Sequence, residues 1–230
     1  GADTPTIDNI SAAFRPIAAR FGMACSIHDQ HVKPKALILV SKPGHCLNDL
    51  LYRTSTGSLG LDVAGIISNH QDQKTLADFY NLTYHHLPVT PETKTDQEAK
   101  IRALIETTEA ELIVLARYMQ ILTPEMCSFL SGRCINIHHS FLPGFKGAKP
   151  YHQAHARGVK LIGATAHYVT PNLDEGPIIE QETSRVSHDH TPDTMERIGR
   201  DLESVVLARA VRYHIEQRVF LHGDRTVVFA

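Results

Sequence analysis

Short apolar runs alternate with amphipathic segments along the middle of the chain. Each run has the length and the branched side chains of a buried strand, and a segment with helical spacing or a polar turn follows it. The predicted strands are 36–41, 61–69, 83–89, 111–118 and 134–139. The predicted helices between them are 46–53, 74–81 and 94–109. This alternation predicts an α/β fold, with a mainly parallel sheet and helices on both of its faces.

The pattern changes after residue 148, where a helix over 148–158 is followed by two longer strands, 159–170 and 176–187. A long helix is then predicted over 191–217, because Thr191 suits the N-cap and Pro192 the first helical position. The last residues, 218–230, have the pattern of a hairpin. We expect the long helix and this hairpin to contribute to the interface of a homo-oligomer.

The first 30 residues are set apart from the rest of the chain. Helical spacing predicts a helix over 7–22 that ends at Gly22, and the apolar run 23–28 predicts a strand. A polar connector, 29–35, then leads to the first strand of the sheet. We therefore expect a small N-terminal unit, residues 1–30, and a main domain, residues 31–230.

Composition excludes several classes of protein. A chain of 230 residues with 42% hydrophobic and 21% charged residues is typical of a globular domain. The formal net charge of −2 supplies no basic field for nucleic acid. No apolar run approaches the length that crosses a bilayer, so no membrane association is expected.

The cysteine pattern favours a reducing compartment. The chain has four cysteines and no CxxC pair, which argues against a disulfide framework and against a structural zinc site. Its first residues do not resemble a signal peptide. We therefore expect a cytoplasmic protein.

Two polar features could carry chemistry. Strand periodicity places Asn136 and His138 on one face at the end of a buried strand, where ligands bind in parallel sheets. Such a pair can polarise a carbonyl group. Asp174 follows in a turn bounded by Pro171 and Gly176, where its carboxylate could orient the imidazole. Alone, each has a commoner structural explanation, as a strand cap or a turn former.

Longer motifs surround these residues and extend along the chain. They are ILVSKPGHCLNDLLYR (38–53), HHLPVT (85–90), VLARYMQIL (114–122), NIHHSFLPGFKGAKPYHQAHARGVKLIGATAHYVTPNLDEGPIIEQ (136–181) and LHGDRTVVF (221–229). Together they resemble the folate-dependent formyltransferases and, more closely, their formyltetrahydrofolate deformylase branch, from about Phe14 to the C-terminus.

The resemblance implies a Rossmann-like formyltransferase domain that hydrolyses 10-formyltetrahydrofolate to tetrahydrofolate and formate. This reaction would supply formate and balance the one-carbon pools used in purine biosynthesis. The folate is the substrate, and the resemblance implies no cofactor and no metal. The catalytic trio would be Asn136, His138 and Asp174, with Ile137 packed and His139 pointing the other way.

The resemblance also implies the residues that bind the substrate. The pterin pocket would be lined by Met119, Gln120, Ile121 and Leu122, and closed by the loop residues Thr170, Asn172 and Leu173. Gln120 stands where several transferases have an arginine. The N-terminal unit resembles the last helix and strand of an ACT domain, and most of that domain is not in this sequence. An ACT domain would imply an amino-acid effector.

Three alternatives stay open. One is transfer of the formyl group to an amine, which a transferase for phosphorylated amines supports with a Gly- and Ser-rich turn after its first strand. Here that turn carries His45 and Cys46 instead, which we expect to fill the acceptor site and leave room for water. Another is a metal site at His152 and His155, one helical turn apart, joined by His138 or His167. The third is a binding module without catalysis.

Overall fold

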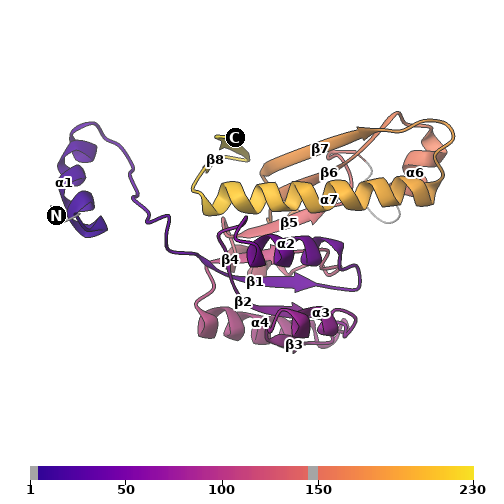
Figure 1. Ribbon diagram of the computed structural model, residues 1–230, viewed down its shortest axis with the longest axis horizontal. Coiled ribbons are helices and arrows are strands. Elements are labelled where there is room, and N and C mark those ends of the chain that lie inside the picture. The colour runs from indigo at the N-terminus through magenta and orange to yellow at the C-terminus, as the bar shows by residue number, and fades with distance from the viewer. Residues whose placement is uncertain (1–4, 145–149) are drawn as a thin grey trace. The chain divides into compact units, whose positions relative to one another are not determined.

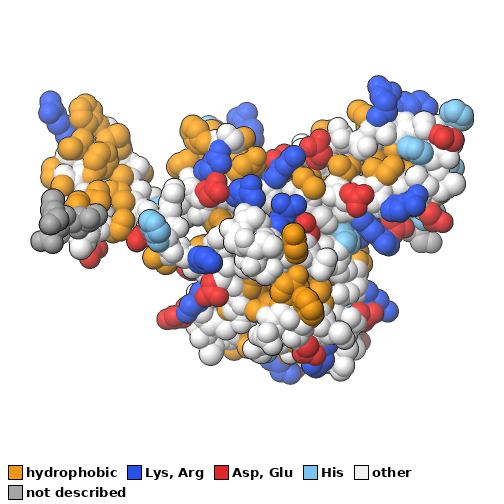
Figure 2. All heavy atoms as spheres, viewed as in Figure 1, with side chains coloured by type: hydrophobic (Ala, Val, Ile, Leu, Met, Phe, Trp, Pro, Cys, Tyr) orange, Lys and Arg blue, Asp and Glu red, His pale blue; other side chains and the backbone are white. Residues whose placement is uncertain are grey.

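The computed structural model describes residues 5–144 and 150–230, and the chain forms two compact units, Gly1–Lys33 and Pro34–Ala230. Helix α1 (Ile7–Arg20) forms in the first unit as predicted, with the Thr6 hydroxyl accepting a hydrogen bond from the Asn9 amide. Its apolar side chains remain largely exposed (Figure 2). The strand predicted over 23–28 was wrong, because no described strand pairs with these residues and a strand needs such a partner.

The second unit is built on a sheet of seven strands in the order β3-β2-β1-β4-β5-β6-β7 (Figure 1). The pairs from β3 to β5 are parallel, whereas β6 is antiparallel to both β5 and β7. The predicted, mainly parallel sheet is therefore confirmed. The strands are β1 (Lys35–Val40), β2 (Asp62–Ser68), β3 (Tyr84–His86), β4 (Leu112–Leu115), β5 (Cys134–His138), β6 (Leu161–Tyr168) and β7 (Ile178–Arg185).

The predicted helices also form, and one more appears. The helices of this unit are α2 (His45–Ser55), α3 (Lys74–Phe79), α4 (Lys94–Thr108), α5 (Pro124–Phe129), α6 (Pro150–Arg157) and α7 (Pro192–Ile215). Helix α5 was not predicted, although Thr123 caps it and Pro124 opens it. The first two residues of the helix predicted over 148–158 lie outside the described residues. A hairpin of β8 (Val219–His222) and β9 (Arg225–Val228) closes the chain as predicted.

Alternation along the strands divides the hydrophobic core between the two faces of the sheet. In β1, Ala36, Ile38 and Val40 pack in a cluster with residues of α2 and α7. Leu37 and Leu39 point to the opposite face and pack in a second cluster with residues of α4 and α5. Because both faces are covered, almost all of β1 is buried, which explains its continuous apolar run.

None of the described helices is both long and apolar enough to span a bilayer.

Candidate active site

Strand β5 brings the first two predicted catalytic residues to the wall of a cavity. Its last residues are Asn136, Ile137 and His138, and Ile137 packs in the core as predicted. Asn136 and His138 both line a cavity of about 600 Å³. Their placement two residues apart on a buried strand fixes the spacing of amide and imidazole.

The loop between β6 and β7 folds back so that Asp174 reaches the same cavity. Tyr168, at the end of β6, pairs with Ile135, three residues before His138. Asp174 nevertheless lies within contact distance of His138, so the loop must turn back along β5. Gly176 allows this path, because a Cβ atom there would lie 1.7 Å from the carbonyl oxygen of Tyr168.

Asp174 itself has a left-handed backbone, with φ 56°. Asp, Asn and His adopt this region more readily than most residues other than glycine, and such backbone is found at helix ends as well as at functional sites. Asp174 Oδ2 lies 3.2 Å from Nδ1 of His138, and Oδ1 lies 3.7 Å from Nε2 of His167. Burial alone would raise the pKa of the Asp174 carboxyl group, but its interactions with His138 and His167 outweigh burial and hold the pKa well below its usual range. The group is therefore a carboxylate at neutral pH.

His167 completes the site and was missed as a partner of the trio. Its Nδ1 lies 2.9 Å from the carbonyl oxygen of Tyr168, which can only accept, so Nδ1 carries the hydrogen. In the neutral ring Nε2 then accepts the hydrogen bond from Asn136 Nδ2, at 3.2 Å. His167 thus orients the amide of Asn136 and lies beside Asp174.

His138 presents an unpaired nitrogen. Its side chain is buried, and Nε2 has no hydrogen-bond partner among the described residues. Buried polar atoms without partners are rare and call for a ligand or water to complete them. Since Nδ1 faces Asp174 and the residue lines the cavity, Nε2 is the atom available to a bound molecule.

Part of the cavity lining is apolar and exposed. Met119, Ile121 and Leu173 line the cavity, and their exposed fractions are 53%, 62% and 57%. Asn172 does not line the cavity, and its carbonyl oxygen accepts from the Thr170 hydroxyl instead. The other predicted substrate-binding residues, Gln120, Leu122 and Thr170, line it.

The expectation that His139 points away from the site was wrong. Its ring stacks on that of His138, with centroids 5.1 Å apart. The alternation that predicted opposite directions ends with β5 at His138, so it does not govern the next residue. Burial and the neighbouring charge of Arg117 lower the pKa of His139 to about 4, so its neutral ring accepts a hydrogen bond from Arg117.

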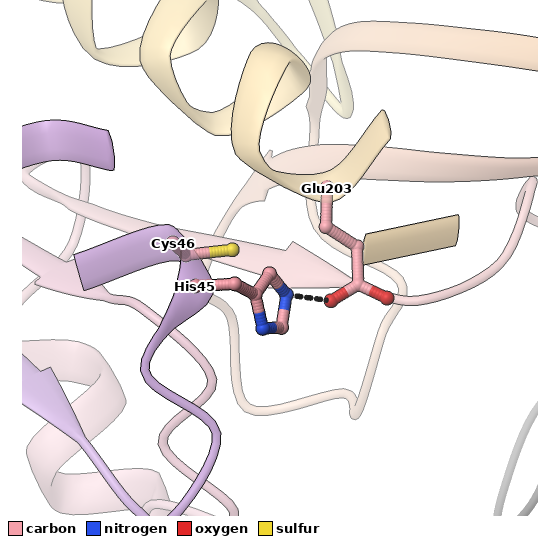
Figure 3. Close-up of side chains that lie close together, drawn as sticks. All are labelled: His45, Cys46 and Glu203. Carbon is pink, nitrogen blue, oxygen red and sulfur yellow. Dashed lines mark hydrogen bonds and ion pairs between the residues drawn. The ribbon is translucent and has the colours of Figure 1, made fainter. Parts of the chain in front are cut away.

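Next to His139 lies a buried ionic cluster that local sequence patterns do not predict. Glu203 of α7 is 1% exposed, and its Oε2 lies 2.7 Å from His45 Nε2 (Figure 3) and 3.3 Å from Arg117 Nε. Its Oε1 accepts from the Tyr151 hydroxyl, at 2.9 Å. Burial alone would raise the pKa of Glu203, but the hydrogen bond from His45 and the charge of Arg117 lower it overall. We call His45, Arg117, Tyr151 and Glu203 the Glu203 cluster.

Cys46 does not fill the acceptor site, contrary to the prediction from the sequence. Its side chain is fully buried in the core, and neither Cys46 nor His45 is among the residues that line the cavity. Burial, with the nearby Glu203 carboxylate, raises the pKa of the Cys46 thiol well above its ordinary value. A protonated thiol behind the wall is a poor nucleophile.

His45, Cys46 and Glu203 also form a group with metal-ligand spacing, their ligand atoms lying within 4.8 Å of one another. A cation there would have to break the hydrogen bond between His45 and Glu203, displace Arg117 and deprotonate Cys46. The donor set therefore fits an ion pair better than a metal. His152 and His155 are exposed on α6 and belong to no metal-ligand group among the described residues.

Comparison with known proteins shows to which family this chain belongs. Residues 34–211 match the formyl transferase family. The chain belongs to the formyl transferase family. The matched segment contains the trio, His167 and the Glu203 cluster.

Among its formyl transferase relatives, a formyltetrahydrofolate deformylase of Corynebacterium sp. (strain P-1) is 51% identical over 222 residues, which cover 96% of this chain and 78% of that protein. The crystal structure of a formyltetrahydrofolate deformylase from Burkholderia mallei superposes with a TM-score of 0.93 at 57% identity, covering 100% of this chain and 82% of that one. A glycinamide ribonucleotide transformylase of Symbiobacterium toebii is more distant, with a TM-score of 0.82 and 27% identity over 90% of this chain and 99% of that one.

Proposed function

We propose that this chain hydrolyses 10-formyltetrahydrofolate to tetrahydrofolate and formate. The observation that carries the reaction is the arrangement of His138, with Nδ1 facing the Asp174 carboxylate and Nε2 unpaired beside the cavity. The hydrolytic outcome is supported by the similar proteins, at 51% and 57% identity, that are named formyltetrahydrofolate deformylases.

The proposed reaction begins with attack of a water oxygen on the formyl carbon. Negative charge develops on the formyl oxygen, where Asn136 Nδ2 and the protonated Nε2 of His138 act as donors. Before the attack, the charge of the Asp174 carboxylate stabilises the imidazolium of His138, and during the attack the carboxylate accepts one proton of the water. The bond between the formyl carbon and the folate nitrogen then breaks, and that nitrogen takes the proton from Asp174. Formic acid finally releases its own proton to solvent.

The cavity offers a place for the rest of the substrate. We propose that the flat pterin packs between the apolar residues Met119 and Ile121 and the loop residue Leu173, whose side chains are exposed and line the cavity. Burial of these three side chains would provide the affinity, and polar groups of the same wall would fix the orientation. The formyl-bearing nitrogen would lie beside Asn136 and His138.

An assay that follows the formyl group of 10-formyltetrahydrofolate, with and without an added amine, tests this function. Release of formate and tetrahydrofolate in equal amounts, without any added amine, supports a hydrolase. A requirement for an amine, with the formyl group recovered on it, would instead identify a transferase.

We further propose a cytoplasmic location, supported by four cysteines that are all free. The amino-acid effector and the homo-oligomer stay predictions from the sequence, and so does the ACT-like nature of the first unit.

A further inference from the structure

The Glu203 cluster forms the part of the cavity wall that adjoins the catalytic residues. Arg117, Tyr151 and Glu203 all line the cavity, and His45 supports Glu203 from behind. The cluster meets the site through His139, whose Nδ1 accepts from Arg117 and whose ring lies 6.3 Å from that of Tyr151. Four separate segments contribute to the cluster, namely α2, the segment after β4, α6 and α7, and all of them except α2 line the cavity.

The cluster is tightly packed. Tyr151 lies directly against α7, because a Cβ atom at Gly199 would lie 1.9 Å from the Tyr151 hydroxyl oxygen. Gly199 precedes Glu203 by one helical turn, so the same face of α7 makes room for the phenol ring and accepts its hydrogen bond. The wall is therefore closed by side chains that fit one another.

Both oxygens of the Glu203 carboxylate already have partners. Oε1 accepts from Tyr151, while Oε2 accepts from His45 and faces Arg117. A carboxylate in the wall would otherwise be a natural partner for the N–H groups of an incoming amine. Here it is neutralised and already hydrogen-bonded, and an ammonium group that approached it would meet the positive charge of Arg117.

Resting on the proposed function, we propose that the Glu203 cluster excludes amines from the formyl carbon and so makes water the acceptor. An amine acceptor needs room for the groups attached to its nitrogen, as well as a partner for its N–H bonds. The apolar wall at Met119, Ile121 and Leu173 is the proposed folate side, and the cluster occupies the wall beside His139. Water needs neither the extra volume nor the free carboxylate.

The turn after β1 does not itself fill the acceptor side of the cavity, because neither His45 nor Cys46 lines it. Cys46 lies in the core and does not take part. His45 acts indirectly, by holding Glu203 in place, and the steric closure comes from Tyr151.

The test replaces Tyr151 and follows two products from 10-formyltetrahydrofolate, formate and N-formylglycinamide, in the presence of glycinamide. Tyr151→Ala removes both the ring and its hydrogen bond. Tyr151→Phe keeps the ring, and His155→Ala is a control on the exposed side of the same helix. We expect Tyr151→Ala to raise the fraction of formyl groups recovered on glycinamide about tenfold or more, since small differences in pocket volume change selectivity by this order. His155→Ala should keep the wild-type fraction, whereas Tyr151→Phe, which keeps the ring but frees Oε1 of Glu203, should give a fraction between those of the wild type and Tyr151→Ala.

A Tyr151→Ala protein that folds, as judged by circular dichroism, but formylates no more glycinamide than the wild type would overturn the inference. If Tyr151→Ala does not fold, His45→Ala serves instead, because the His45 side chain is 20% exposed and its loss frees one side of Glu203. If His45→Ala then formylates no more glycinamide than the wild type, that result would overturn the inference. Formate release by the wild type without amine tests the proposed function separately, so the two failures are distinguishable.

Discussion

Replacing Asp174 with asparagine isolates the charge of the carboxylate from its geometry. Asparagine tolerates the left-handed backbone found at this position better than most residues do, so the loop should keep its path. Its side-chain oxygen can still accept from His138 Nδ1, which lies 3.2 Å from Asp174 Oδ2. What the variant loses is the negative charge between His138 and His167 and the ability to accept a proton.

The expected loss can be estimated from these roles. General acid–base groups contribute about 10²–10⁴-fold to turnover, which corresponds to ~3–5 kcal/mol of activation free energy. Exchanging a charge-assisted hydrogen bond for a neutral one should lower the free energy of unfolding by no more than ~2 kcal/mol. Activity should therefore fall much further than stability.

The assay measures formate release, folate affinity by calorimetry and the unfolding midpoint in the same preparation. Asp224→Asn, in the exposed turn of the C-terminal hairpin, is the matched control and should behave as wild type. Near wild-type turnover of Asp174→Asn, with its stability unchanged, would refute the role of the carboxylate.

Three further predictions follow from the site and its surroundings. Asn136→Ala should lower turnover more than folate affinity, because an oxyanion donor acts chiefly in the transition state; equal losses would make it a ground-state contact. Met119→Glu should raise the substrate dissociation constant with little effect on the bound-state rate, and unchanged affinity would place the folate elsewhere. Burial lowers the pKa of His214 to about 4. Since the unfolded side chain titrates near ~6.5, stability should fall by up to ~3 kcal/mol as pH drops from 6.5 to 4. Urea unfolding of His214→Gln should show a smaller fall, and identical pH curves would contradict this.

Local patterns predicted most of the fold, because the spacing of apolar residues within each helix or strand indicates which of its faces is buried. The alternating sides of β1, Ala36 and Ile38 against Leu37 and Leu39, are an example. The strand predicted over 23–28 failed because local propensity cannot supply a partner strand. Helix α5 is only six residues long, too short for periodicity to reveal, although its Thr-Pro start was a usable signal.

Only those site residues that lie in recognisable motifs, such as Asn136, His138 and Asp174, could be predicted from the sequence. His167 meets Asn136 through the antiparallel register of β5 and β6, which no local pattern encodes. The sequence does contain a signal for Glu203, because it is a charged residue on the buried, apolar face of α7 beside Val206 and Leu207. Its partners come from segments up to 158 positions away in the chain, so their convergence requires the fold.

The most direct test of the central claim is a turnover of 10-formyltetrahydrofolate in water enriched in oxygen-18, with no amine present. Hydrolysis predicts formate and tetrahydrofolate in equal amounts, with one solvent oxygen in each formate, because the attacking water forms the new bond to the formyl carbon. Absence of formate, or formate without solvent oxygen, would contradict the proposal that water is the acceptor.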